Sequence, residues 1–254
     1  MNDCNAVTTL MNADEKLSKD MCPKNEDEKK EIEKLPYQNL IGCLLYLAGS
    51  TRPDIAYTVS VLSQFNTNFG IKHWIAAKRV LRYLKGTQNL GLLFKKNGKN
   101  LTGYAVADWG ASIGDRRSYT GFIFSYGSTA ISWESRKQRT VAMSSTEAEY
   151  MAISESAKEA IYLRRFLDEI LDSQGPTTIF NDNQSAGRLC RNPIFHNRTK
   201  HIDLRYHFIR EAIERGDIQI DYKETSQMPA DILTKAISYP KHKHCIEMIA
   251  LQKS

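Results

Sequence analysis

The sequence predicts an α/β protein in which a mixed sheet with flanking helices follows a small helical segment. Two observations support this. Apolar residues recur at helical spacing between positions 35 and 87, whereas several short segments after position 88 alternate apolar and polar residues. Strands and helices then alternate towards the C-terminus, which is typical of a sheet covered by helices. With 254 residues, the chain has room for one large domain or two small ones.

The first 34 residues are dense in mixed charge and have no apolar periodicity. They predict a flexible charged arm (1–34) with a short helix near Asp27–Lys34. Residues 35–87 predict three helices, at about Pro36–Ala48, Asp54–Gln64 and Ile71–Leu84. The polar face of the third carries Lys78, Arg79, Arg82 and Lys85, a pattern that fits a solvated face and a nucleic-acid-facing one equally well.

Residues 88–141 predict an antiparallel meander, because its apolar runs alternate and are separated by turn residues. Its strands are expected at Leu90–Phe94, Leu101–Ala107, Tyr119–Ser125 and Thr129–Trp133.

The remaining elements follow in order. A long helix starts at Ser144 or Ser145, a suitable N-cap, and ends near Leu171. Beyond it we expect a strand at Thr178–Asn181, helices at Asn183–Cys190 and Asp203–Arg215, a strand at Ile218–Tyr222, a short helix at Ala230–Ala236, and a C-terminal tail over 239–254.

Four acidic residues occupy positions from which their side chains can meet. Asp108 and Asp182 each end an apolar run, while Glu149 and Asp231 lie early in helical patterns. Carboxylates at strand ends and in first helical turns can converge at one edge of a sheet. Four such oxygen donors suit Mg²⁺, and a pair of Mg²⁺ ions is the arrangement that cleaves phosphodiesters.

The composition is that of an ordinary globular protein, with 41% hydrophobic and 25% charged residues. A net charge of +6 permits an anionic partner. The five cysteines include no CxxC pair, which indicates reduced intracellular thiols rather than a disulfide framework or a zinc site. The longest apolar stretch, Leu40–Ala48, is too short to span a bilayer, and the N-terminus has no signal pattern, so no membrane partner is expected.

Seven sequence words in order resemble the ribonuclease H domain of copia-type retrotransposon Pol polyproteins. They are LPYQNLIGCLLYLAGSTRPDIAYTVSVLSQF, AAKRVLRYLKGT, ADWGASIGDRRSYTG, ISWESRKQRTVAMSSTEAEYMAI, DNQSA, RTKHIDLRYHFIRE and PADILTK. The resemblance covers about Leu35 to Ala236. It implies a ribonuclease H-like fold with a mixed five-stranded sheet over 88–238, preceded by a thumb or connection segment over 35–87.

The resemblance also implies a function. The chain would be a Mg²⁺-dependent endonuclease that hydrolyses the RNA strand of RNA–DNA hybrids during reverse transcription, with Mn²⁺ as a substitute. Its partners would be the hybrid and the polymerase domain of the parent polyprotein, in the cytoplasm within a virus-like particle and with access to the nucleus. The alternative is a non-catalytic nucleic-acid-binding remnant, or a host-adopted protein, with the same fold.

Within that scheme each carboxylate has a role. Asp108 would bridge both metals because it ends the central strand, Asp182 and Glu149 would share one metal, and Asp231 would complete the other site. Glu147 competes with Glu149, but two residues on a helix differ by about 200° in direction, so both cannot face the metals. The family's helix pattern, matched to EYMAI, selects Glu149.

Several polar residues are expected to contact nucleic acid. Hybrid selectivity requires contacts to the 2′-hydroxyl, for which Asn183, Gln184 and Ser185 are candidates, although helix capping explains them equally well. Arg116 and Arg117 would contact backbone phosphate. The segment around Arg198, Lys200 and Arg205 is basic, which favours a nucleic-acid surface over a zinc site built from His196, His201, His207 and Cys190, since that spacing fits no standard finger.

Two features depart from many ribonucleases H. The stretch Lys223–Ala230 contains no histidine, which many family members use there to aid product release. Pro229 also directly precedes Ala230 and Asp231. Proline is tolerated in a first helical turn, so the position of Asp231 is expected to survive.

Overall fold

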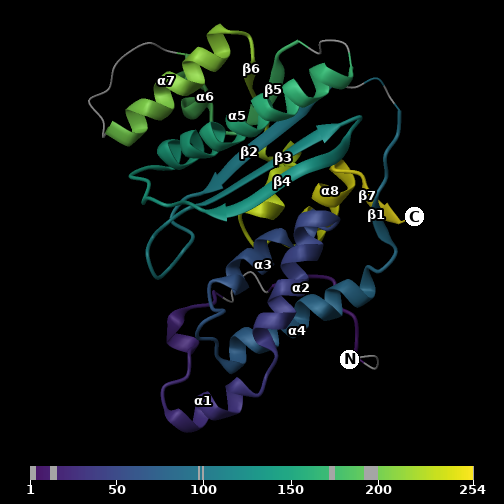
Figure 1. Ribbon diagram of the computed structural model, residues 1–254, viewed down its shortest axis with the longest axis vertical. Helices are drawn as coiled ribbons and strands as arrows, with labels where there is room; N and C mark the ends of the chain where they lie inside the picture. Colours follow the sequence, from purple (N-terminus) through teal and green to yellow (C-terminus); the bar gives the residue numbers. More distant parts are fainter. Residues whose placement is uncertain are drawn as a thin grey trace.

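The computed structural model describes residues 4–11, 16–96, 98, 100–171, 175–191 and 200–253, without the side chains of 200–203. A helical segment lies on one side of a twisted five-stranded sheet, and longer helices cover the sheet on the opposite side (Figure 1). The helical and strand segments follow the order that the sequence predicts.

The helical segment contains the three expected helices. They are α2 (Tyr37–Ser50), α3 (Ala56–Ser63) and α4 (Ile71–Gly86), with the short turn η2 (Pro53–Ile55) before α3. Their apolar faces meet in one cluster that includes Tyr37, Ile41, Leu44, Val59, Leu62, Ala77 and Val80. The short helix expected in the arm is also present, as α1 (Glu26–Glu33), after a single turn η1 (Lys19–Met21).

The N-terminal arm, expected to be flexible, is held against α4 in its first described residues. Arg79 Nε donates to Thr9 O at 3.1 Å, Arg82 Nε to Asn5 O at 2.7 Å, and Lys85 Nζ to Cys4 O at 2.9 Å. The Leu10 side chain is buried in the helical core. Three of the four basic residues on the polar face of α4 therefore bind the arm, which neither interpretation of that face anticipated.

The predicted mixed five-stranded sheet is confirmed. Its strands are β2 (Thr102–Asp108), β3 (Tyr119–Tyr126), β4 (Thr129–Lys137), β5 (Thr177–Asn181) and β6 (Ile218–Tyr222), in the spatial order β4-β3-β2-β5-β6. The first three are antiparallel, while β5 runs parallel to β2 and β6 parallel to β5. The C-terminal ends of the parallel strands β2 and β5 therefore lie beside each other at one edge.

Apolar layers pack on both faces of the sheet. On one face α5 (Ser145–Ile170) lies across β2 and β3, with α6 (Gln184–Arg191) and α7 (Lys200–Glu214) beside it (Figure 1). Alternate residues of one strand point to opposite faces. Phe122 and Phe124 accordingly join the α5 cluster, whereas Ile123 between them joins the cluster beneath η4 (Pro229–Leu233) and α8 (Tyr239–Met248).

The segment assigned to a C-terminal tail is folded. It forms α8, followed by β7 (Leu251–Lys253), which pairs antiparallel with β1 (Leu90–Leu92) in a separate two-stranded sheet. α8 packs on η4 through Cys245, Ile246 and Ile249. The C-terminal segment therefore packs against η4, the turn that contains Asp231.

A glycine in β3 lets η4 approach the sheet closely. A Cβ atom added at Gly121 would lie 2.7 Å from Leu233 Cβ, 2.8 Å from Thr234 Cγ2 and 3.1 Å from Ala230 O. Contacts below 3 Å are not tolerated, so any side chain here would push η4 outward. The expected short helix at Ala230–Ala236 is in fact this tighter 3₁₀ turn, which ends at Leu233.

Candidate active site

Asp108 and Glu149 come from two elements that pack directly on each other. Asp108 is the last residue of β2, and Glu149 lies in the second turn of α5, which crosses that strand. Asp108 is half-buried, and burial raises the pKa of its carboxyl, as does the neighbouring Asp231. Glu149 is almost fully buried, and burial, with a contribution from Asp182, raises its pKa to about 8.

Asn181 holds Glu149 in place. The Asn181 Nδ2 group donates to Glu149 Oε2 at 2.8 Å and to Ala105 O at 2.8 Å. The amide therefore ties the end of β5 to β2 and to α5 at once. The Ala107 backbone N–H also donates to the Glu149 carboxylate, and both donors partly offset the effect of burial on its pKa. Sequence analysis did not identify Asn181, whose only signal is a polar residue at the buried end of an apolar strand.

Glu147 makes hydrogen bonds at the start of α5, away from Glu149. Its Oε2 accepts from the Met143 N–H at 2.9 Å, while its own N–H donates to Ser144 Oγ at 3.2 Å. The bond to Ser144 Oγ satisfies an N–H group that has no partner within the helix, and the bond from Met143 fixes the residue before the N-cap. Ser144 is thus the N-cap, and the structure directs Glu147 to the helix start and Glu149 to the strand ends.

Asp182 and Asp231 approach from the other side. Asp182 directly follows β5 and is partly exposed, and its Oδ2 accepts from Thr225 Oγ1 at 2.6 Å. Asp231 lies in η4 with only 1% of its surface exposed. Its two carboxylate oxygens face two different ammonium groups: Oδ1 is 3.0 Å from Lys235 Nζ, and Oδ2 pairs with Lys241 Nζ.

Lys235 is the common neighbour of the four carboxylates. Burial lowers the pKa of its ammonium, but Asp231, Asp108 and Asp182 outweigh that effect and raise it. Lys235 in turn favours the ionised form of Glu149. The direct contact is with Asp231, while the other three carboxylates act on Lys235, or Lys235 on them, through their charge. Lys235 itself was not anticipated.

The donor set fits Mg²⁺ in chemical type, because that ion prefers carboxylate oxygens. The side chains are nevertheless not arranged as a finished metal site. Among the described residues, no group of three or more Asp, Glu, His or Cys side chains is placed so that it could hold a metal ion. Both oxygens of Asp231 are paired with lysines, and Asp182 accepts from Thr225.

The loop residues expected to contact nucleic acid lie around this edge. Arg116, in the loop after β2, is exposed and has a positive φ of 56°, and Arg117 forms an ion pair with Asp115 at 3.7 Å. Asn183 accepts from the Ala186 N–H at 2.9 Å, so the capping interpretation describes its contact here. Gln184 is exposed at the start of α6.

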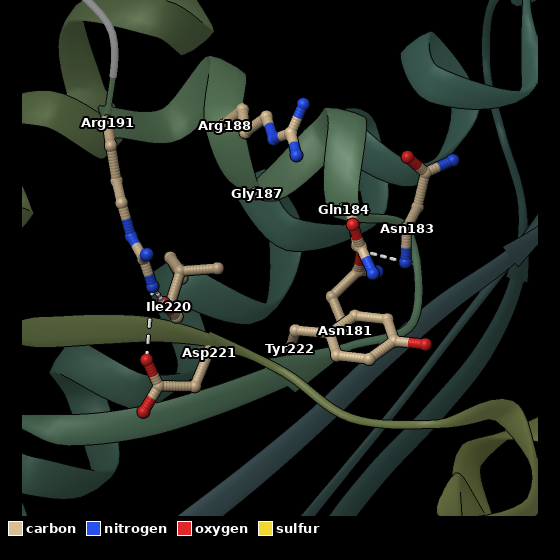
Figure 2. Close-up of a pocket in the computed structure, with 9 residues that line it drawn as sticks. All are labelled: Asn181, Asn183, Gln184, Gly187, Arg188, Arg191, Ile220, Asp221 and Tyr222. Carbon is tan, nitrogen blue, oxygen red and sulfur yellow. Dashed lines mark hydrogen bonds and ion pairs between the residues drawn. The ribbon is translucent and has the colours of Figure 1, made fainter.

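A pocket of about 250 Å³ opens between α6 and the ends of β5 and β6. Figure 2 shows Gln184 and Arg188 on the helix side and Tyr222 on the strand side. Arg191 is turned away towards β6, where it contacts Ile220 O and lies 3.1 Å from Asp221 Oδ1. The pocket adjoins Asp182 through its neighbours Asn181 and Asn183.

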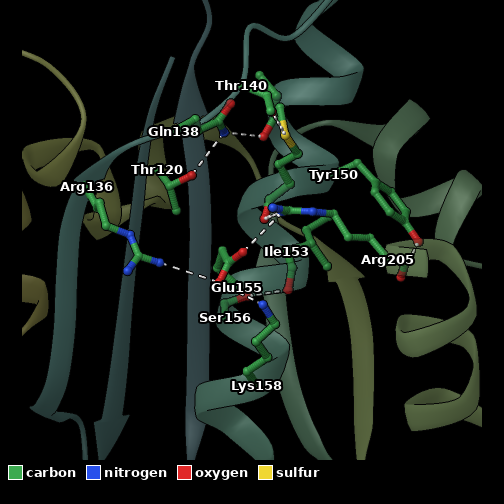
Figure 3. Close-up of polar contacts among 12 residues, drawn as sticks. Thr120, Arg136, Gln138, Thr140, Tyr150, Ile153, Glu155, Ser156, Lys158 and Arg205 are labelled. Atoms are coloured by element: carbon green, nitrogen blue, oxygen red, sulfur yellow. Dashed lines mark hydrogen bonds and ion pairs between the residues drawn. The ribbon is translucent and has the colours of Figure 1, made fainter. Parts of the chain in front are cut away.

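The basic segment is only partly visible. Arg198 and His196, with the side chains of Lys200 and His201, lie outside the described residues. Arg205 packs against α5, where its Nη1 lies 3.2 Å from Glu155 Oε1 and 3.4 Å from Met151 O. Glu155 also pairs with Arg136 at 3.5 Å and Lys158 at 3.0 Å (Figure 3). In this structure the Arg205 guanidinium therefore joins α7 to α5.

Comparisons with known proteins identify relatives of the chain. It is 42% identical over 254 residues to the Pol polyprotein of transposon TNT 1-94 from Nicotiana tabacum, covering 100% of this chain and 19% of that protein. It is 43% identical over 204 residues to the Pol polyprotein of transposon RE2 from Arabidopsis thaliana, covering 80% of this chain and 14% of that one. The chain is a relative of copia-type retrotransposon Pol polyproteins.

The chain spans about a fifth or less of the length of these two relatives. No family model matches it. A shorter relative, the secreted RxLR effector protein 161 of Plasmopara viticola, is 49% identical over 133 residues, covering 52% of this chain and 94% of that protein. Among solved structures, a ribonuclease H1 isolated from compost is similar over 53% of this chain and 92% of that one, with 14% identity and a TM-score of 0.41.

The resemblance found in the sequence is confirmed by these relatives, and the expected mixed five-stranded sheet with flanking helices is present. Among the described helices, none has the length and apolar content needed to cross a membrane.

Proposed function

We propose that the chain cleaves the RNA strand of RNA–DNA hybrids with the help of two divalent cations, as part of reverse transcription. The observation that carries this proposal is the placement of four carboxylates on elements that pack together. Asp108 ends β2 and Asp182 follows the neighbouring strand β5, Glu149 on α5 is hydrogen-bonded to Asn181 at the end of β5, and Asp231 lies in η4 beside β2 and β3. Repulsion among neighbouring carboxylates would favour the binding of a divalent cation there.

The carboxylates would hold Mg²⁺ or Mn²⁺, which supply activation of the attacking water and stabilisation of the departing 3′ oxygen. Asp108 would serve both ions, because it lies at the end of the central strand β2. Asn181 contributes by fixing the direction of the Glu149 carboxylate through its 2.8 Å hydrogen bond. Such outer contacts commonly set how well a ligand binds its metal.

The surface around Asp182 would receive the hybrid. Gln184 offers an exposed amide next to the carboxylates, while Arg188 and the half-exposed Tyr222 line the adjoining pocket. An amide, a guanidinium and an aromatic ring suit a ribose 2′-hydroxyl, a phosphate and a base respectively. Arg116 lies on the other side of Asp108, where it would contact backbone phosphate.

The test is cleavage of an RNA strand, labelled at one end, in an RNA–DNA hybrid by the full chain. We expect Mg²⁺- or Mn²⁺-dependent products that disappear on chelation, and no cleavage of matched DNA–DNA or RNA–RNA duplexes. Asp108→Asn serves as the control against contaminating nucleases. If the chain leaves the hybrid intact even when joined to a polymerase partner, the proposal is wrong.

The alternative is a non-catalytic nucleic-acid-binding protein with the same fold. The match to an RxLR effector favours it, because that protein carries about half of this sequence under a name that is not a Pol polyprotein. Hybrid binding that neither responds to divalent cations nor leads to cleavage would support this alternative.

A further inference from the structure

The C-terminal helix α8 brings a second ammonium group to the proposed metal site. Lys241, in the first turn of α8, pairs with Asp231 Oδ2, while Lys235 lies 3.0 Å from the other oxygen, Oδ1. The Asp231 side chain is only 2% exposed, whereas that of Lys241 is 34% exposed. A buried carboxylate needs a partner of opposite charge, and here each of its oxygens has one.

The position of Lys241 is fixed by the packing of α8. The next residue, His242, is buried and packs edge-on against the ring of Tyr83, with centroids 5.6 Å apart. Further along the helix, Cys245 and Ile246 are buried in one cluster with Met228 and with residues of η4 such as Ala230. Because α8 is anchored on two sides, the first turn is held over Asp231 and the Lys241 stem needs only to extend to reach it.

A divalent cation at Asp231 needs at least one carboxylate oxygen. Oδ1 is paired with Lys235, which follows Asp231 by four residues in the chain, whereas Oδ2 is paired with Lys241 from the separate helix α8. Both lysine side chains are partly exposed, 37% for Lys235 and 34% for Lys241. When the Lys241 ammonium leaves, Oδ2 becomes available.

We propose that Lys241 is a built-in competitor of the metal ion at Asp231, so that α8 sets the metal affinity of the site. This inference rests on the proposed metal site and adds a residue outside the ribonuclease H-like sheet to it. The chain without substrate would bind divalent cations weakly at Asp231. A hybrid, whose phosphates attract the displaced ammonium, would favour the exchange of Lys241 for metal.

The experiment is a calorimetric titration of Mn²⁺ into the full chain, at low salt and without nucleic acid. Lys241→Met keeps the length of the side chain and removes the charge, and we expect it to tighten Mn²⁺ binding on the order of tenfold. Lys243→Met is the matched control, since it lies on the same helix, is exposed and pairs only with Glu247 at 3.8 Å in the described structure. It removes the same net charge and should leave the affinity within about twofold.

Two further variants localise the effect. Lys241→Arg keeps the charge and should retain the parent's affinity for Mn²⁺. This variant also keeps the inference testable if Lys241→Met does not fold. In an Asp231→Asn background, replacing Lys241 by Met should no longer change Mn²⁺ binding, because the carboxylate for which the two cations compete has been removed.

The outcomes separate this inference from the proposed function. If the parent binds Mn²⁺ in a manner that requires Asp108, but Lys241→Met and Lys243→Met behave alike or Lys241→Met weakens binding, the competitor role is refuted and the metal site stands. If neither the parent nor Lys241→Met binds Mn²⁺ through Asp108, both the inference and the proposed metal site are overturned.

Discussion

Replacing Glu149 by Gln should make the stability of the metal-free protein depend less on pH. Burial raises the pKa of Glu149 to about 8, from an ordinary value of 4.5. Between these values the folded state keeps a proton that the unfolded state releases, so the contribution of this group to stability is full below pH 4.5 and is lost as the pH rises towards 8. Glutamine carries no such proton.

The size of the effect follows from the interval between the two pKa values. Each pH unit corresponds to about 1.4 kcal/mol. The free energy of unfolding of Glu149→Gln, minus that of the parent, should therefore rise by up to about 3 kcal/mol between pH 5 and pH 7.5. Glutamine has one acceptor oxygen for the two donors, Asn181 and the Ala107 N–H. This loss lowers the free energy of unfolding of the variant by about 1–2 kcal/mol at every pH. The variant should be the less stable protein near pH 5 and the more stable one above pH 7.

The assay is denaturant unfolding of both proteins in chelator across this pH range. Glu147→Gln is the matched control, since its change lies two residues away at the same helix start. It weakens the bond from the Met143 N–H and removes a negative charge from a helix N-terminus, which should destabilise the protein by about 0.5–1 kcal/mol at pH 7. Glu149→Gln should abolish hybrid cleavage while Glu147→Gln keeps it. A Glu149→Gln difference that is flat with pH would refute the environment assigned to this carboxyl, and equal losses of cleavage would refute its role.

Three further outcomes are expected. Asp108→Asn should remove cleavage and leave the fold intact, with a far-ultraviolet dichroism spectrum like that of the parent; substantial residual cleavage would contradict its assignment as the shared ligand. Gly121→Val should destabilise the protein by about 1–3 kcal/mol on denaturant unfolding and reduce cleavage, because it displaces η4 and Asp231. Gly42→Ala in α2 is the control: its new Cβ meets nothing within 4 Å, so it should stabilise the protein by up to about 1 kcal/mol in the same assay. Arg205→Ala should lower stability by about 1 kcal/mol through the lost contact with Glu155, and a fall of about one unit in the salt slope of hybrid binding would show instead that Arg205 contacts phosphate.

The sequence was most informative where local patterns determine structure. The helix from Ser145 to Ile170 and the strand that ends in Asp108 have clear periodicity and termini, and both were located within one or two residues. The four acidic residues could be assigned to strand ends and helix starts, because both are recognisable in the sequence. The fixed helical period showed that Glu147 and Glu149 cannot both face the same way, and the resemblance to the family then selected Glu149.

What the sequence did not reveal depends on contacts between distant segments. α8 has no regular apolar face, and its helix is stabilised by packing on η4 and the helical segment rather than by its own pattern. The pairing of β1 with β7 joins residues about 160 positions apart. The charged arm lacks the apolar periodicity of a packed segment, yet basic side chains of α4 bind its backbone carbonyls. Lys241 could not be assigned to Asp231 before α8 was known.

The helical segment and the candidate site are linked through a buried polar cluster. Asp54 is 1% exposed and accepts from Arg52 Nη2 at 2.7 Å and from the Tyr83 hydroxyl at 2.7 Å. Loss of one member would leave a buried charge without its partner, which is strongly unfavourable, so Arg52, Asp54 and Tyr83 are held as a unit.

The ring of Tyr83 is also the surface on which His242 of α8 rests, and the residue before His242 is Lys241. One face of α8 therefore meets the helical segment while its first turn meets Asp231. A second contact, from Trp133 Nε1 in β4 to Ala48 O at 2.7 Å, ties the same segment to the far edge of the sheet. Residues 35–87 thus do more than precede the sheet in the chain, because they fix the helix whose lysine occupies an oxygen of the most buried carboxylate of the site.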